Sequence, residues 1–178
     1  MRSTTLMKSL ISSIGSALIL TLALAAPAAA QQPSRPVSGG NDQTMLVGAG
    51  LTFLHGGDST GVGFAGNALF NALKTTDTGR IGIVGDLGWN HFDGGSVTTV
   101  MGGGRYTFTT KGKVVPYGQF LVGIVHSPGD TDFNPSLGFG ADVAWLPNLN
   151  FRGEISFIFA DSNATRFFLG VSLPIHKR

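Results

Sequence analysis

Six charged residues lie inside runs of small and apolar residues, where a buried charge without a partner would be costly. They are Asp86, Arg105, Asp142, Arg152, Glu154 and Arg166. The carboxylates of Asp142 and Glu154, which flank Arg152 in sequence, are of a type that can do acid–base chemistry. No nucleophile and no predicted cleft accompany them. We therefore interpret the three acids and three bases as a balanced, structural charge network.

Other residues of reactive type lack the arrangement that catalysis or metal binding requires. His126 and Ser127 are adjacent, and neighbouring residues of a strand point to opposite faces, which arranges them badly as base and nucleophile. The histidines at 55, 91, 126 and 176 show no metal-ligand spacing, and the sequence contains no cysteine. Gly102-Gly103-Gly104 has no strand–loop–helix context and is not a phosphate loop. We predict no enzyme activity, no metal site and no cofactor.

The first 30 residues have the parts of a secretory signal peptide. Arg2 and Lys8 precede the mostly apolar run Leu10–Ala25, and Ala28-Ala29-Ala30 supplies a small-residue cleavage site. An uncleaved membrane anchor is the alternative. We expect the chain to be exported and to begin at Gln31 after cleavage.

The rest of the chain divides into a polar tail at 31–43, predicted to be disordered, and one folded domain at 44–178. Once Arg2 and Lys8 are removed, ten basic and ten acidic residues remain, and this neutral balance gives no indication of a nucleic-acid partner. Charged residues make up 12% of the sequence, against about 25% in ordinary soluble domains, and there are 27 glycines. This surface is unusual for a soluble exported protein.

Apolar residues alternate with small or polar ones in eight runs, which predicts eight β-strands. The runs cover approximately 44–55, 61–72, 80–92, 96–109, 114–126, a segment around 135–145, 149–160 and 163–175. The connections between them are short, and include 56–60, 73–79, 93–95, 111–113, 127–131, 147–148 and 161–163. Consecutive strands with short links pair as neighbours, and runs of about ten residues match tilted membrane-spanning strands. The sequence predicts an all-β fold, an eight-stranded antiparallel up-and-down transmembrane β-barrel.

The two faces of these strands differ, and the environment of the protein depends on which face points inward. In Pro135–Trp145 (PSLGFGADVAW), one face carries Pro, Leu, Phe, Ala, Val and Trp, and the other Ser, Gly, Gly, Asp and Ala. An apolar face inside would make a soluble periplasmic or secreted lipocalin-like barrel that binds an apolar ligand. Its outer wall would then be rich in glycine, which weakens a sheet. An apolar face outside makes a membrane barrel, whose lumen pairs the six charges. We favour the membrane barrel and keep the soluble barrel as the alternative.

Several aromatic residues near the ends of the runs are candidates for girdles at the two membrane interfaces. They are Trp89, Phe92, Tyr106, Phe108, Trp145 and Phe159. Five of them fall on the apolar face, whereas the facing of Phe92 is not determined by the alternation.

Three segments resemble small bacterial outer-membrane β-barrel proteins of the OmpA/OmpX-like and opacity-antigen-like superfamily. Val115–Gly123 resembles the "P-Y-x-x-x-x-x-G" strand of that group, and Leu137–Val143 is similar to the "G-x-G-x-D" strand that follows it. Asn163–Ile175 looks like the closing strand, in which an Asn and an Arg precede "G-V". The resemblance extends from about Thr44 to the end of the sequence.

The resemblance implies an outer-membrane protein with a structural or surface role and a lumen plugged by the charge network, so that no open pore is expected. Its expected partners are outer-membrane lipid, lipopolysaccharide and, during insertion, the barrel-assembly machinery. The sequence ends His176-Lys177-Arg178, without the aromatic residue that many such proteins present to this machinery. The termini are expected on the periplasmic side, which places the links at 56–60, 93–95, 127–131 and 161–163 outside. A barrel-wall enzyme that acts on lipid A through His126 and Ser127 is a further alternative.

Overall fold

The structure is a computed structural model that describes residues 43–146, 148–160 and 163–176. The signal peptide predicted at 1–30 and all but the last residue of the tail predicted at 31–43 lie outside the described residues. Eight strands form the described chain: β1 (Gln43–Gly56), β2 (Ser59–Thr75), β3 (Gly79–Phe92), β4 (Gly95–Phe108), β5 (Val114–Ser127), β6 (Asp130–Leu146), β7 (Leu149–Ile158) and β8 (Ala164–His176). Within those residues, no helix is long and apolar enough to span a membrane.

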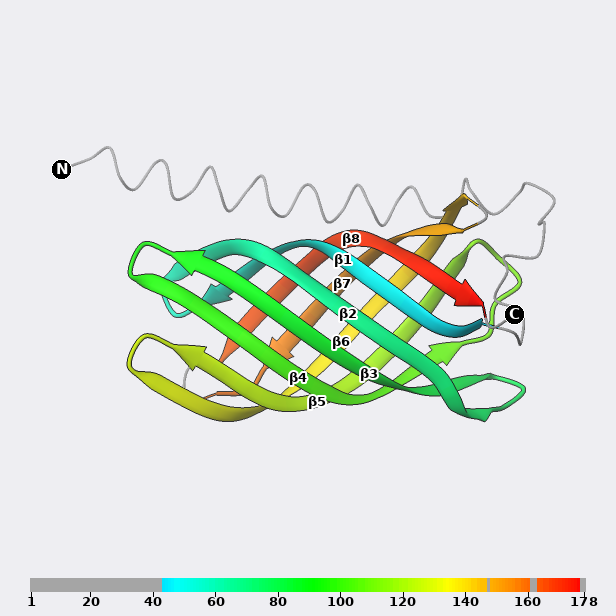
Figure 1. The fold of residues 1–178 in the computed structure, drawn as a ribbon, viewed down its shortest axis with the longest axis horizontal. Helices are drawn as coiled ribbons and strands as arrows, with labels where there is room; N and C mark the ends of the chain where they lie inside the picture. The colour runs from blue at the N-terminus through cyan, green and yellow to red at the C-terminus, as the bar shows by residue number, and fades with distance from the viewer. Residues whose placement is uncertain (1–42, 147, 161–162, 177–178) are drawn as a thin grey trace. The chain divides into compact units, whose positions relative to one another are not determined.

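The strands form a closed barrel in which each strand pairs with its neighbours in sequence, and β1 pairs with β8 to complete the ring. All pairs are antiparallel; Leu51 of β1, for example, lies opposite Phe64 of β2 and Leu169 of β8. The strands are inclined to the barrel axis, and β1 begins at the same end at which β8 finishes (Figure 1). The predicted eight-stranded up-and-down barrel is confirmed.

Tight hairpins join the strands at the end opposite the start of β1. Three of them have two-residue turns, because pairing continues to Gly56–Ser59, Phe92–Gly95 and Ser127–Asp130. Gly57 and Gly129 adopt φ values of 57° and 88°, a region that residues with a Cβ rarely enter. The links predicted at 56–60, 93–95 and 127–131 are therefore shorter than expected, since the residues that flank each turn belong to the strands.

A side-chain hydrogen bond crosses each of these three hairpins. It joins a histidine to the hydroxyl residue five positions later: His55 Nδ1 to Thr60 Oγ1 at 2.9 Å, His91 Nδ1 to Ser96 Oγ at 3.2 Å, and His126 Nδ1 to Thr131 Oγ1 at 2.7 Å. The members of each pair lie directly opposite one another on adjacent strands. Cross-strand pairs of this kind hold the register of a hairpin.

The second strand is longer than its alternation indicates. The sequence predicts a connection over 73–79, whereas β2 runs to Thr75. The pairing of β2 with β3 shifts between Phe70 and Lys74 and then resumes with Lys74 opposite Ile81. An irregularity of this kind shifts the alternation of faces, and so the end of the strand could not be seen in the sequence pattern.

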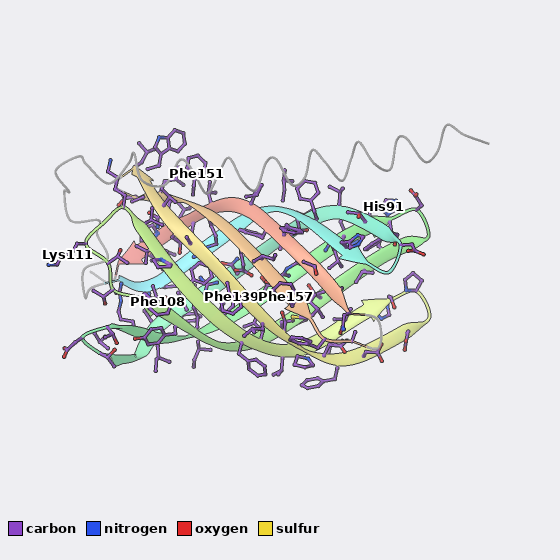
Figure 2. The ribbon with its side chains drawn as sticks, turned by 180° about the vertical axis from the view of Figure 1, so that it is seen from behind. His91, Phe108, Lys111, Phe139, Phe151 and Phe157 are labelled. Carbon is purple, nitrogen blue, oxygen red and sulfur yellow. The ribbon has the colours of Figure 1, made fainter. Side chains whose placement is uncertain are left out.

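The apolar face of the strands points outward. Phe133 is 71% exposed and Phe64 61% exposed, whereas Arg152 is 1% exposed. Figure 2 shows Phe139 and Phe157 on the outside of the barrel. The soluble alternative requires the opposite arrangement, with the apolar side chains filling the interior.

The interior is less uniformly polar than the alternation of the strands predicts. Seven buried apolar side chains form a cluster inside the barrel: Leu46, Leu54, Leu69, Val84, Met101, Leu121 and Ile158. Phe92, whose facing the alternation left open, packs against this cluster and is therefore not part of an outer aromatic girdle. Isolated leucines on a polar face do not disturb a period-two pattern enough to be noticed, yet in a narrow lumen they meet one another.

Candidate functional site

The candidate site is the middle of the lumen, where the six predicted charges are located. Asp86 comes from β3, Arg105 from β4, Asp142 from β6, Arg152 and Glu154 from β7, and Arg166 from β8. Because side chains alternate along a strand and each of these residues occupies an inward position, the closed sheet points all six at one another. All six are buried, with the arginines 1% exposed and the acids between 4% and 7%.

Asp142 and Arg152 form a bidentate ion pair across β6 and β7, where they lie directly opposite one another. Arg152 donates from Nε to Oδ1 at 2.8 Å and from Nη2 to Oδ2 at 2.9 Å. Its third nitrogen, Nη1, donates to Oδ1 of Asn67 on β2, and Ser172 of β8 donates to Asp142 Oδ1 at 3.0 Å. Through these contacts, the ion pair connects β6 and β7 to β2 and β8, the two strands that flank β1.

Glu154 is the centre of a second group. Its Oε2 accepts from the Tyr117 hydroxyl at 2.7 Å, and its Oε1 accepts from Gln119 Nε2 at 2.8 Å and from Ser156 Oγ at 2.7 Å. Nitrogens of two arginines, Arg105 Nη2 and Arg166 Nη2, each lie 3.7 Å from one of its oxygens. A carboxylate that accepts three hydrogen bonds and has two nearby cations is well satisfied in a buried site.

The two arginines beside Glu154 also have partners of their own. Arg105 donates from Nε and Nη2 to Gln119 Oε1 at 2.9 and 2.6 Å, and its guanidinium stacks 3.9 Å from the centre of the Tyr117 ring. Arg166 Nη1 donates to Asp86 Oδ1 at 2.7 Å. The contacts thus run from Asp86 through Arg166 and Glu154 to Arg105, across the inside of the barrel.

The neutral members of this network were not singled out from the sequence. They are Asn67, Tyr117, Gln119, Ser156 and Ser172. Tyr117 and Gln119 lie on the same face of the alternation as the charges, and that shared face was the available signal. Their role depends on which strands face each other across the lumen. The spacing of residues along one strand does not reveal this.

Some inward glycines leave room for the large side chains of the network. A Cβ on Gly140 would lie 2.5 Å from the Tyr117 hydroxyl oxygen, a distance that real Cβ atoms essentially never show. A residue without a Cβ at position 140 therefore makes room for the Tyr117 side chain. In a barrel of eight strands the interior is only just wide enough for its side chains.

The described residues provide no arrangement for metal binding, since no group of three or more His, Cys, Asp or Glu is placed to hold an ion. His126 and Ser127 lie on opposite sides of the barrel wall: the histidine bonds to Thr131, while the serine lines a cavity inside. The arrangement in the lumen is therefore one of mutual ion pairing among groups that are shielded from solvent.

Comparison with known proteins gives a fold and no closer relationship. No protein-family model matches the sequence, and no curated protein matches it. Among solved structures, Neisserial surface protein A is similar with a TM-score of 0.58 at 14% identity, covering 76% of this chain and 100% of that one. The N-terminal β-barrel domain of Pseudomonas aeruginosa OprF has a TM-score of 0.52 at 15% identity, covering 76% and 100%.

A third similar structure is a de novo designed transmembrane β-barrel, with a TM-score of 0.57 at 18% identity, covering 76% of this chain and 98% of the design. Likenesses at these identities concern architecture, and a fold by itself does not specify a function. The chain therefore has the fold of small eight-stranded transmembrane β-barrels, as the resemblance in its sequence indicates.

Proposed function

We propose that this protein is a small outer-membrane β-barrel with a structural or surface role and without enzymatic activity, exported by the predicted signal peptide at 1–30. The observation that carries the proposal is the inverted polarity of the barrel, with apolar side chains outside and paired ions inside. In water, each large apolar side chain left exposed forgoes about 1.5–3 kcal/mol of burial free energy. In a lipid bilayer the same side chains contact apolar acyl chains, and this loss does not arise.

The distribution of charge on the outer wall supports a membrane location. Away from the strand ends, the outward positions of the described strands carry no Asp, Glu, Lys or Arg. A charge at the lipid-facing midplane of such a barrel costs about 2–4 kcal/mol, so a wall without charges is the expected one.

Aromatic pairs at both ends of the barrel support the proposal further. Trp145 stacks on Phe151 with ring centres 4.4 Å apart, near the end of the barrel at which β8 finishes. At the hairpin end, Trp89 lies 5.3 Å from Phe64 and stacks on His91 at 6.0 Å. Aromatic residues in belts at two levels are typical of proteins that span a membrane.

We further propose that the lumen is closed by the charge network and by the apolar cluster beside it. Arg105, Arg152 and Arg166 are all but inaccessible to solvent, which supports a plugged interior in place of a water-filled channel. An open pore would leave the charged side chains hydrated. In planar bilayers, the purified protein should give no steady conductance, and a stable open channel would contradict this part of the proposal.

The partners proposed for such a barrel follow from its location. They are outer-membrane lipid and lipopolysaccharide along the apolar wall, and the barrel-assembly machinery during insertion. With the termini on the periplasmic side, the hairpins at Gly57, Asp93 and Gly129 face outward. No nucleic-acid partner is proposed, because the chain is neutral once Arg2 and Lys8 are removed.

The first test is a carbonate wash of cell envelopes followed by a blot for the mature protein. Retention in the membrane pellet, and release only by detergent, is the expected result. A protein that washes into the supernatant would overturn the proposal and favour a soluble barrel. Separation of inner and outer membranes on a density gradient then tests which membrane holds the protein.

A further inference from the structure

The three hairpins with two-residue turns carry the same pair of residue types on the outside of the barrel. Each has a histidine at the second position before the turn and a serine or threonine at the second position after it, and the segments read HGGDST, HFDGGS and HSPGDT. The histidines are His55, His91 and His126, and all three are exposed. Figure 2 shows His91 at the hairpin end of the barrel.

The strand register joins these pairs into one band around the outside of the barrel. Consecutive members of the band are paired across two strands or lie two residues apart along one strand, and the single step from β2 to β3 passes through Val62, which lies opposite His91. The band contains imidazole and hydroxyl side chains from every strand except β7: Thr165, His55, Thr60, His91, Ser96, Thr98, His126 and Thr131. We call these residues the histidine–hydroxyl band.

The apolar wall of the barrel ends at this band. Two positions closer to the middle, the outward residues are Phe53, Trp89 and Ile124, which are between 37% and 47% exposed. Beyond the band the chain enters the turns, where Asp58 and Asp93 are exposed. Under the proposed function, on which this step rests, the apolar wall lies in a bilayer. The band then lies at the level of the lipid headgroups.

The hydrogen bonds within the band orient its imidazole rings. Each histidine Nδ1 lies 2.7–3.2 Å from the hydroxyl oxygen of its partner. With Nδ1 held in this way, Nε2 is the ring nitrogen that is left to meet a group outside the protein. A histidine takes up a proton in the mildly acidic range, and both of its ring nitrogens then donate. A lipid phosphate accepts such hydrogen bonds and carries the opposite charge.

The charges around the band favour an anionic partner on the lipid side. The segments 53–62, 89–98 and 124–133 contain no Lys or Arg, so the imidazoles are their only side chains that can become cationic. The residues opposite the histidines on the neighbouring strands are hydroxyl residues and Val62, none of which titrates in this range. The acids of these segments are Asp58 in a turn and Asp93, Asp130 and Asp132, which line the cavity inside the barrel.

From these observations we infer that the histidine–hydroxyl band is a binding surface for the phosphate groups of lipids in the leaflet at the hairpin end. Its affinity for anionic lipids increases as the pH falls and the imidazoles become protonated. This assigns the headgroup contacts of the barrel to three histidines and makes those contacts dependent on pH. The inference concerns the hairpin end and holds for either orientation of the barrel in the membrane.

The chain has two tryptophans, and Trp89 can report on lipids beside the band because it stacks on His91 with ring centres 6.0 Å apart. The full mature protein with Trp145→Phe is refolded into vesicles of phosphatidylcholine and phosphatidylglycerol. Bromine on the acyl chains of one lipid or the other quenches the fluorescence of Trp89, and the two degrees of quenching give the relative affinity for the anionic lipid. Each intensity is divided by that of the same mixture without bromine at the same pH, because a protonated histidine itself quenches a stacked tryptophan. We expect the relative affinity for phosphatidylglycerol to be roughly two- to fivefold higher near pH 5 than near pH 8.

Substitutions of the same kind at the two ends of the barrel separate the band from the rest of the protein. Glutamine keeps a hydrogen-bonding side chain that cannot be protonated. The triple substitution His55→Gln, His91→Gln and His126→Gln should abolish the pH dependence, and His91→Gln alone, beside the reporter, should remove most of it. His176→Gln, at the end of β8, is the matched control and should leave the pH dependence unchanged. Circular dichroism verifies that each variant is folded.

Three results would overturn the inference. They are a relative affinity that does not change with pH in the parent protein, a pH dependence that persists in the folded triple variant, and a pH dependence that is lost in His176→Gln. In each of these cases brominated phosphatidylcholine still quenches Trp89, so the barrel is in the bilayer and the proposed function stands. If neither brominated lipid quenches Trp89, the wall does not face lipid, and the proposed function fails together with this inference.

Discussion

The inner and outer faces of the same strands obey opposite rules, and β7 shows this within ten residues. Its outward side chains are Phe151, Ile155 and Phe157, and its inward ones are Arg152, Glu154 and Ser156. Phe151 and Phe157 are exposed and Ile155 is half-buried, and none of the three has a polar group that needs a partner. The inward residues are buried and are held by named atoms on other strands. Along this one strand, the outward residues need only be apolar, whereas the inward residues must meet specific partners.

This difference indicates where the barrel is sensitive to change. On the outer face the polarity of a side chain should matter and its identity should not, because lipid makes no geometric demands. On the inner face, even a conservative change removes a partner from a group that cannot reach water. The following predictions test this contrast in order of expected effect.

The largest effect is expected from Arg152→Met. The substitution leaves Asp142 buried without its bidentate partner, and breaking a buried pair in this way costs about 3–5 kcal/mol of unfolding free energy. Reversible urea unfolding of the barrel in lipid vesicles measures it. Lys111→Met, at an exposed turn, is the control and should lie within about 0.5 kcal/mol of the parent. Figure 2 shows Lys111 at one end of the barrel.

Restoring neutrality in the pair sharpens the same test. Asp142→Asn combined with Arg152→Met removes the stranded carboxylate, so the double variant should be more stable than Arg152→Met alone. If the single and double variants are equally destabilised, then the loss arises from packing and the ion pair is not its cause.

A charge on the outer face is expected to have the next largest effect. Leu169 lies in the middle of β8 and is 54% exposed, so Leu169→Arg should cost about 2–4 kcal/mol in a bilayer. Val114→Arg, at the start of β5, places the same charge near the interface and should cost about 0–1 kcal/mol. Equal costs for the two variants would contradict a depth-dependent lipid environment along the wall.

Two adjacent glycines of β4, one on each face of the strand, allow the two faces to be compared by adding a single methyl group. A Cβ on Gly103 would overlap the carbonyl oxygen of Phe120, whereas a Cβ on Gly104 has no atom within 4 Å. Gly103→Ala should therefore cost about 1–3 kcal/mol, and Gly104→Ala should be neutral or stabilising by up to about 1 kcal/mol. The same unfolding assay measures both variants. Similar effects at the two positions would mean that the inner wall is less crowded than the structure indicates.

The smallest effect is expected from His126→Ala. It removes an exposed cross-strand hydrogen bond to Thr131, so the loss of stability should be about 0.5 kcal/mol or less. The lipid A composition of cells that express this variant should match that of cells with the parent protein. A changed acylation pattern with a folded barrel would revive the catalytic alternative, despite the placement of His126 and Ser127 on opposite faces.

The sequence alone determined the fold class, because local properties suffice for it. Period-two alternation does not depend on tertiary contacts, and short links restrict strands to neighbour pairing. The sequence also identified the six charges by type, since ionisable residues in mid-strand positions stand out against glycine. The signal peptide at 1–30 and the tail at 31–43 stay predictions, because all of their residues except Gln43, which begins β1, lie outside the described structure.

Only the tertiary structure decided which groups meet. That Arg152 pairs with Asp142, and that Glu154 collects Tyr117, Gln119 and two arginines, depends on the register of eight strands and on the closure of β1 onto β8. The inward turn of Phe92 and the apolar cluster in the lumen depend on the same geometry. A strand's own alternation states which face a residue occupies. The partners that the residue finds there are set by rotation and stagger of strands far apart in the chain, and no local pattern contains that information.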